Sequence, residues 1–135
     1  MRHKIVGVST AILIAVALGV APAHAKTVRK NCSAGGDSLS TTVYYDSDGS
    51  NWFVERNSFT LVDNSEDHNN VSMRLKNGSS TYFLWSSDDD IPGGATYSEA
   101  VDEAVPRAGS PNMRTNVVFD QSGGDPSCST YAWLT

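Results

Sequence analysis

The dipeptide Asn77-Gly78 limits the possible folds of this chain more than any other local feature. Asn-Gly supplies the two positive-φ positions of a type I′ turn, and apolar side chains alternate along residues 70–86 on both sides of it. We therefore predict a β-hairpin in which Asn77 and Gly78 form the loop. Pairing the residues outward from this loop puts five apolar side chains on the expected core face: Val71, Met73, Leu75, Tyr82 and Leu84.

The opposite face of this hairpin is the best candidate for a binding site. The polar side chains Asn70 and Arg74 indicate that this face is exposed to solvent. The same face also carries two large aromatic side chains, Phe83 and Trp85. Exposed aromatic rings can stack on a sugar or on a partner surface, so these four residues predict a site for an extracellular glycan or protein. The alternative is that Phe83 and Trp85 pack beneath a covering segment as a small second core.

The first 25 residues are typical of a secretory signal peptide. Arg2 and Lys4 precede an apolar run over residues 5–20, and Ala-His-Ala ends the segment at Ala25, where cleavage is expected. The run is shorter than the about 20 apolar residues that span a bilayer. We expect a secreted, extracellular protein without a membrane span, and 135 minus 25 leaves a mature chain of 110 residues.

The mature chain is expected to be acidic. Without Arg2 and Lys4, eight Lys and Arg remain against fifteen Asp and Glu. Nucleic-acid binding needs a basic footprint, so we do not expect a nucleic-acid partner. An acidic balance is typical of a soluble protein, and we expect a monomer.

Cys32 and Cys128 are the two cysteines of the chain, one near each end of the mature part. In an oxidising compartment they are expected to form one structural disulfide. The alternative is two free thiols. A zinc site is not expected, because two cysteines without a neighbouring histidine do not make one.

Alternating segments bounded by turn residues fill most of the remaining chain. We expect residues 26–39 to be an N-terminal lead-in and residues 40–135 a single β-domain. Strands expected outside the hairpin cover residues 40–45, 51–62, 112–120 and 127–134, and the first two should pair with each other. The fold class is therefore all-β, a small antiparallel sandwich or barrel of about six strands.

The connection over residues 87–111 is long for a segment without structure. Thr96 and Glu99 match a capping box, and apolar residues follow at helical spacing before Pro106. We predict one short helix over residues 97–105, which would cover Phe83 and Trp85.

The chain offers little for metal binding or catalysis. Asp88, Asp89 and Asp90 are weak candidate metal ligands, for which a solvated acidic loop is the favoured interpretation, and no cofactor is expected. His68, the histidine outside the signal segment, lies in a polar stretch without a nucleophile motif. A carboxylate pair of the glycosidase type stays open, because fifteen acidic residues give many pairs, so a small extracellular hydrolase is one alternative function.

A second alternative function depends on Pro106, Arg107 and Ala108. A basic residue behind a proline in an exposed connection has the form of a rigid, substrate-like loop for a trypsin-like protease. The simpler interpretation is a proline-bounded linker whose arginine faces solvent. The leading prediction is a noncatalytic, secreted β-domain that binds a glycan or a protein, with a serine protease inhibitor as the alternative from another class.

Overall fold

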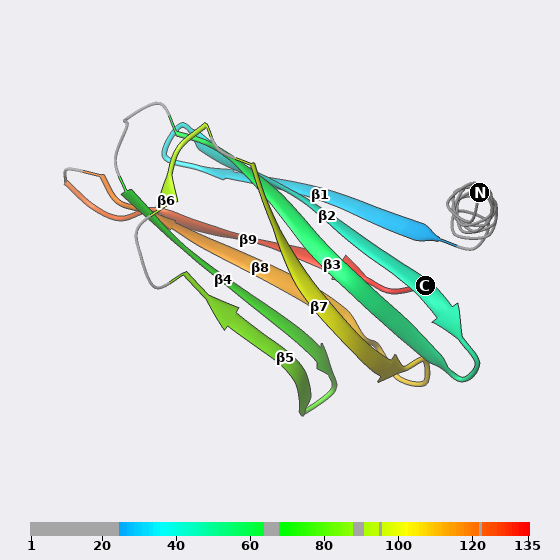
Figure 1. Ribbon diagram of the computed structural model, residues 1–135. Helices are drawn as coiled ribbons and strands as arrows, with labels where there is room; N and C mark the ends of the chain where they lie inside the picture. Colours follow the sequence, from blue (N-terminus) through cyan, green and yellow to red (C-terminus); the bar gives the residue numbers. More distant parts are fainter. Residues whose placement is uncertain (1–24, 64–67, 88–90, 95, 122) are drawn as a thin grey trace, which may run out of the picture.

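A computed structural model describes residues 25–63, 68–87, 91–94, 96–121 and 123–135 (Figure 1). The expected signal peptide lies outside these residues except for Ala25. The described strands are β1 (Lys26–Ala34), β2 (Asp37–Asp48), β3 (Asn51–Val62), β4 (His68–Asn77), β5 (Ser80–Ser86), β6 (Ile91–Pro92), β7 (Thr96–Pro106), β8 (Asn112–Phe119) and β9 (Ser127–Trp133). Within this part of the chain there is no helix of the length and apolarity needed to cross a membrane.

Two antiparallel sheets stack face to face as a sandwich (Figure 1). One sheet has the strand order β1-β2-β3-β7, and the other has the order β5-β4-β8-β9, with the two-residue β6 on the end of β4. The all-β prediction is confirmed, with nine strands in the described residues instead of about six. Residues 26–39, expected as a lead-in, form β1 and the start of β2. The sequence did not indicate β1, because it is a mostly polar edge strand with little apolar alternation.

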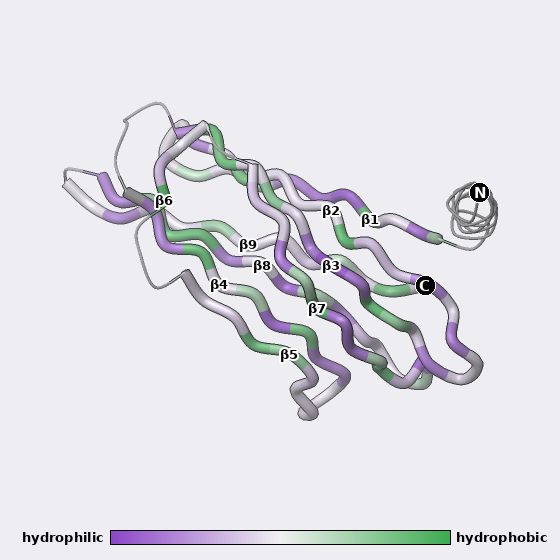
Figure 2. The backbone as a smooth tube through the Cα atoms, in the orientation of Figure 1, coloured by the Kyte–Doolittle hydropathy of each residue, from purple (hydrophilic) through white to green (hydrophobic). Residues whose placement is uncertain are grey.

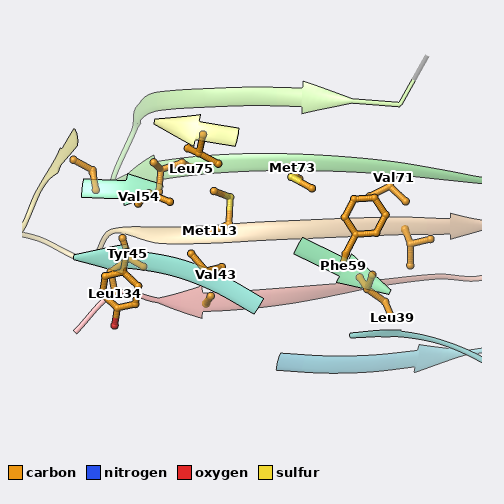
Figure 3. Packing of buried hydrophobic residues seen from close by; sticks show 14 of the residues in the cluster. Leu39, Val43, Tyr45, Val54, Phe59, Val71, Met73, Leu75, Met113 and Leu134 are labelled. Atoms are coloured by element: carbon orange, nitrogen blue, oxygen red, sulfur yellow. The ribbon is translucent and has the colours of Figure 1, made fainter. Parts of the chain in front are cut away.

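Alternate side chains of each strand fill the space between the sheets. Along β4 the hydropathy of successive residues alternates, as period-2 side-chain placement requires (Figure 2). Val43, Val54 and Phe59 of one sheet face Val71, Met73, Leu75 and Met113 of the other (Figure 3). This core holds both sheets in register, so the outward rows of each strand are equally well defined.

A disulfide joins the two sheets at one side of the sandwich. Cys32 in β1 and Cys128 in β9 are bonded, with their Cα atoms 6.0 Å apart and a sequence separation of 96. The predicted pairing is confirmed. It connects the edge strand of one sheet to the edge strand of the other.

The predicted helix over residues 97–105 is wrong, because this segment lies within β7, the edge strand beside β3. Tyr97, Val101 and Val105 recur every four residues, and that spacing fits one face of a helix and also alternate positions of a strand. Val101 and Val105 are buried. Pairing with β3 overrides the local helical signal, and a bulge places Asp102 at a φ of 49°.

The turn between β4 and β5 differs from the predicted one. Asn77 pairs with Ser80, so the loop residues are Gly78 and Ser79 instead of Asn77 and Gly78. Gly78 has a φ of 61°, whereas the φ of Asn77 is not the positive value that the first loop position of a type I′ turn would require. A glycine at the first loop position is typical of a type II′ turn.

A bulge in β5 reverses the faces predicted for this hairpin. Leu75 pairs with Phe83 and Arg74 with Leu84, which leaves Tyr82 as an extra residue. The shifted loop alone would keep every side chain on its predicted face, but one extra residue moves the rest of β5 to the other face. Phe83 and Trp85 therefore pack against the core, and Leu84, predicted as core, is 70% exposed.

Candidate functional site

The outer face of the β5-β4-β8-β9 sheet carries four side chains in direct register, here called the arginine row. Leu84 pairs with Arg74, Arg74 with Arg114, and Arg114 with Tyr131. Directly opposed residues of antiparallel strands project to the same face, so these side chains lie next to one another across four strands. Leu84 and Tyr131 are 70% and 46% exposed, and both arginines are half-buried.

Polar side chains form the next row on the same face, here called the hydroxyl row. Register pairs join its members across the same four strands: Ser86, Ser72, Asn116 and Ser129. On the other side of the arginine row, Lys76 pairs with Asn112, and Asn112 pairs with Trp133, which is 49% exposed. The face therefore combines cations, hydrogen-bonding groups and exposed aromatic rings.

A groove of about 370 Å³ opens on this face. Its lining consists of Ser72, Met73, Arg74, Leu84, Trp85, Ser86, Arg114 and Asn116. Most of these residues belong to the arginine row or to the hydroxyl row. The groove thus follows the β5-β4-β8 part of the outer face.

Arg74 and Arg114 are a like-charge pair at the centre of this face. They are directly opposite each other on β4 and β8, a position in which side chains approach to about 5 Å and equal charges repel. None of the described groove-lining residues is an Asp or Glu. The salt bridge found in the described part of the chain joins Glu55 to Arg56 on the other sheet. The pair is notable because the whole chain has a formal charge of −5.

Neighbouring side chains support the guanidinium of Arg114. Its Nε donates a hydrogen bond of 3.3 Å to Oγ of Ser129, and that hydroxyl donates one of 2.8 Å to Oδ1 of Asn116. The ring centroid of Tyr131 lies 5.9 Å from the guanidinium carbon. The Arg74 side chain has no such hydrogen bond or ionic partner among the described residues. One guanidinium is therefore held in place and its neighbour is available.

The structure separates the four binding residues predicted from the sequence. Asn70 and Arg74 lie on the outer face, and Asn70 is exposed. Phe83 and Trp85 point inward, although Trp85 still borders the groove. Of the predicted set, Arg74 and Trp85 belong to the groove.

Trp85 belongs to an aromatic cluster between the edges of the two sheets. Its ring centroid is 6.1 Å from that of Phe59, and Phe59 stacks on Tyr97 of β7 at 5.3 Å. Phe83 and Trp85 therefore pack against the main core between the sheets and do not form a separate core beneath a helix. This packing fixes the inner side of β5 beneath the groove.

The loop that contains Pro106, Arg107 and Ala108 is fastened to the β2–β3 turn. The guanidinium carbon of Arg107 lies 4.2 Å from the ring centroid of Trp52, and its Nη1 donates a 3.2 Å hydrogen bond to Oγ of Ser47. The backbone N–H of Arg107 donates to the carbonyl of Ser50 at 3.0 Å. The side chain that would enter a protease pocket thus already has partners within the domain.

The remaining candidates lie at the limits of the described residues. Asp88, Asp89 and Asp90 are outside them, and the side chain of His68 is not described. In the described part of the chain, no three His, Cys, Asp or Glu residues gather as metal ligands would.

Sequence reasoning missed five residues on the same outer face as Arg74: Leu84, Arg114, Asn116, Tyr131 and Trp133. Alternation around the buried Met113, Thr115 and Val117 does place Arg114 and Asn116 on an outer face. The missing information was the pairing of β4 with β8, which are separated by three intervening strands in sequence.

Comparison with models of protein families, with curated proteins and with solved structures finds no match for this chain. The fold and the groove define its class by themselves. It is a disulfide-linked antiparallel β-sandwich with a cationic groove on one outer sheet face.

Proposed function

We propose that this protein is a secreted, noncatalytic domain that binds a glycan on the outer face of the β5-β4-β8-β9 sheet. The observation that carries the proposal is the groove of about 370 Å³ with Arg74 and Arg114 at its centre. Secretion rests on the signal-peptide pattern of residues 1–25.

The chemistry of this face suits a sugar. Hydroxyl and amide groups of Ser72, Ser86 and Asn116 line the groove and can donate to or accept from sugar hydroxyls. On the same outer face, Tyr131 lies next to Arg114 and Trp133 lies one row further from the groove; both expose about half of their surface, and aromatic rings of this kind stack on the apolar face of a sugar ring. Binding sites commonly combine such an apolar surface with a few fixed polar groups.

A noncatalytic role is supported by the composition of the groove. Glycoside hydrolysis normally uses a pair of Asp or Glu residues, and the described lining contains none. The protease-inhibitor alternative is less well supported, because Arg107 stacks on Trp52 instead of projecting from the loop.

Retention on immobilised polysaccharides tests the proposal. The wild-type protein should bind at least one member of a panel of neutral and acidic polysaccharides, and Arg74→Ala/Arg114→Ala should lose this binding. The matched control is Arg29→Ala/Arg56→Ala, which removes two arginines from the outer face of the opposite sheet. Equal loss in both double variants, or no binding by the wild type, would contradict a site in the groove.

A further inference from the structure

We infer that the groove takes an acidic polysaccharide, with a carboxylate or sulfate group of the ligand held between the guanidinium groups of Arg74 and Arg114. This inference rests on the proposed function and specifies its ligand. It starts from the register, because Arg74 and Arg114 are directly opposite each other on β4 and β8.

Two adjacent arginines with no acidic side chain among the described groove-lining residues disfavour the free state. Equal charges directly opposite in a sheet repel, and burying half of each side chain reduces the water that screens them. An oxyanion between them would convert the repulsion into two attractive contacts. Arginine presents a planar fork of donors that matches a carboxylate in bidentate geometry, and also binds tetrahedral oxyanions.

The groups around Arg114 prepare it for such a ligand. Ser129 and Asn116 connect to it through hydrogen bonds of 3.3 and 2.8 Å, and Tyr131 lies beside it at 5.9 Å. A side chain that is already oriented loses less conformational freedom when it binds. Arg74 lies between Leu84 and Arg114 in the row and lines the same groove as Arg114, so an anion in the groove can contact both side chains.

The distribution of charge favours an acidic ligand on this face. The outer face has Arg74, Lys76 and Arg114 and no Asp or Glu among its described residues. Carboxylates of the opposite sheet, among them Glu55, Asp46 and Asp48, lie on other surfaces. An anion near this outer face therefore meets Arg74 and Arg114 without opposing carboxylates among the described residues of the face.

A polysaccharide fits this face better than a nucleic acid. The hydroxyl row runs parallel to the arginine row and offers partners for sugar hydroxyls along an open groove. A nucleic acid would need neutralisation of many phosphates along a long basic surface, and three cations on one face do not supply it.

Titration calorimetry at low ionic strength tests the inference with pairs of polymers that differ in charge. Polygalacturonate is compared with its methyl ester, and dextran sulfate with dextran. Single-stranded DNA of similar charge serves as a nonsugar polyanion. We expect binding to polygalacturonate or to dextran sulfate. The matching neutral polymer should bind at least about tenfold more weakly, because it loses at least one hydrogen bond to a charged group. The two pairs distinguish a carboxylate ligand from a sulfate ligand.

Substitutions then locate the anion. Arg74→Ala and Arg114→Ala should each weaken binding about tenfold, and Arg74→Lys should restore only part of it, because lysine keeps the charge and loses the fork. Arg29→Ala/Arg56→Ala should bind like the wild type.

The outcomes separate the two proposals. Equal affinity for charged and neutral polymers, still lost in Arg74→Ala/Arg114→Ala, would overturn the acidic ligand and leave the glycan site standing. Equal affinity for DNA and the acidic polysaccharides would overturn the acidic-glycan inference in favour of general anion attraction. No binding to any polymer would overturn both proposals.

Discussion

The side-chain amide of Asn57 in β3 donates a hydrogen bond of 2.8 Å to Oγ1 of Thr115 in β8, and this bond joins the two sheets through the middle of the core. Both residues are buried. A second bond of the same kind connects Thr41 of β2 to Thr130 of β9 at 2.9 Å. Among the described residues, these two bonds cross a mostly apolar core, and both depend on how the two sheets are placed relative to each other.

Replacing Thr115 with valine should destabilise the domain by about 1 to 3 kcal/mol, because the amide of Asn57 then lies buried without its partner. The free energy of unfolding in urea measures this cost. The double variant Asn57→Leu/Thr115→Val should cost less than the two single changes added together. Additive costs would show that the two residues act independently.

Trp85→Ala should destabilise the domain by about 3 kcal/mol, because it removes a ring that packs on Phe59. The neighbouring change Leu84→Ala should stay within about 0.5 kcal/mol, because Leu84 is 70% exposed. Urea unfolding of both variants measures the difference. A larger cost for Leu84→Ala than for Trp85→Ala would mean that Leu84 faces the core and Trp85 the opposite side, as the Asn77-Gly78 turn predicted.

Arg74→Gln should stabilise the ligand-free protein by about 0.2 to 1 kcal/mol, since it removes repulsion from Arg114. The gain should shrink at 1 M salt, where the screening length is about 3 Å. Thermal unfolding at two salt concentrations gives both values, and Arg29→Gln on the other sheet is the control. A loss of stability at low salt would mean that the two guanidinium groups do not repel each other.

Asn77→Ala should loosen the loop after β7. The amide of Asn77 donates to the carbonyls of Pro106 and Ala108 at 3.1 and 2.7 Å, and its oxygen accepts from the N–H of Ser110 at 3.2 Å. Losing these bonds should cost about 1 to 3 kcal/mol and expose the bond after Arg107 to trypsin.

Mass spectrometry of limited trypsin digests follows that cleavage. Asn112→Ala is the control, because Asn112 makes one side-chain bond of 3.3 Å to Ser110 in the same loop. Equal cleavage of the wild type and Asn77→Ala would show that Asn77 does not fasten the loop.

Cys32→Ala/Cys128→Ala should destabilise the domain by about 4 to 5 kcal/mol on the chain-entropy model, because the bond closes a loop across 96 positions. Urea unfolding measures the loss. Reductant should lower the stability of the wild type toward that of the double variant and leave the double variant unchanged. A wild type equally stable in reductant would show that the bond contributes nothing.

The elements predicted from the sequence are those whose signals are local. The strands around Asn51–Val62 and Asn112–Phe119 show alternation or turn residues within a few positions, and the structure has both. The disulfide followed from two cysteines alone. The segment Thr96–Pro106 failed because its apolar spacing suits a helix and a strand equally, and only its contact with β3 decides between them.

The candidate site depends on information that one strand does not contain. Arg74 was selected from its own hairpin, but Arg114 joins it through pairing between β4 and β8, which are distant in sequence. The extra residue Tyr82 then puts Leu84 on the outer face in place of Trp85. No local pattern marks that bulge, since Tyr82, Phe83 and Trp85 are all aromatic and suit either face.

Asp102, the residue of β7 with a left-handed backbone conformation, affects association between molecules at high concentration. An edge strand of eleven residues offers unpaired backbone groups on which a second copy could add a strand and begin an aggregate. Asp102, at a φ of 49°, divides that edge into two short runs, and Glu99 and Glu103 add negative charge on either side. The bulge therefore protects the open side of the sandwich from edge-to-edge association, as the disulfide closes the other side.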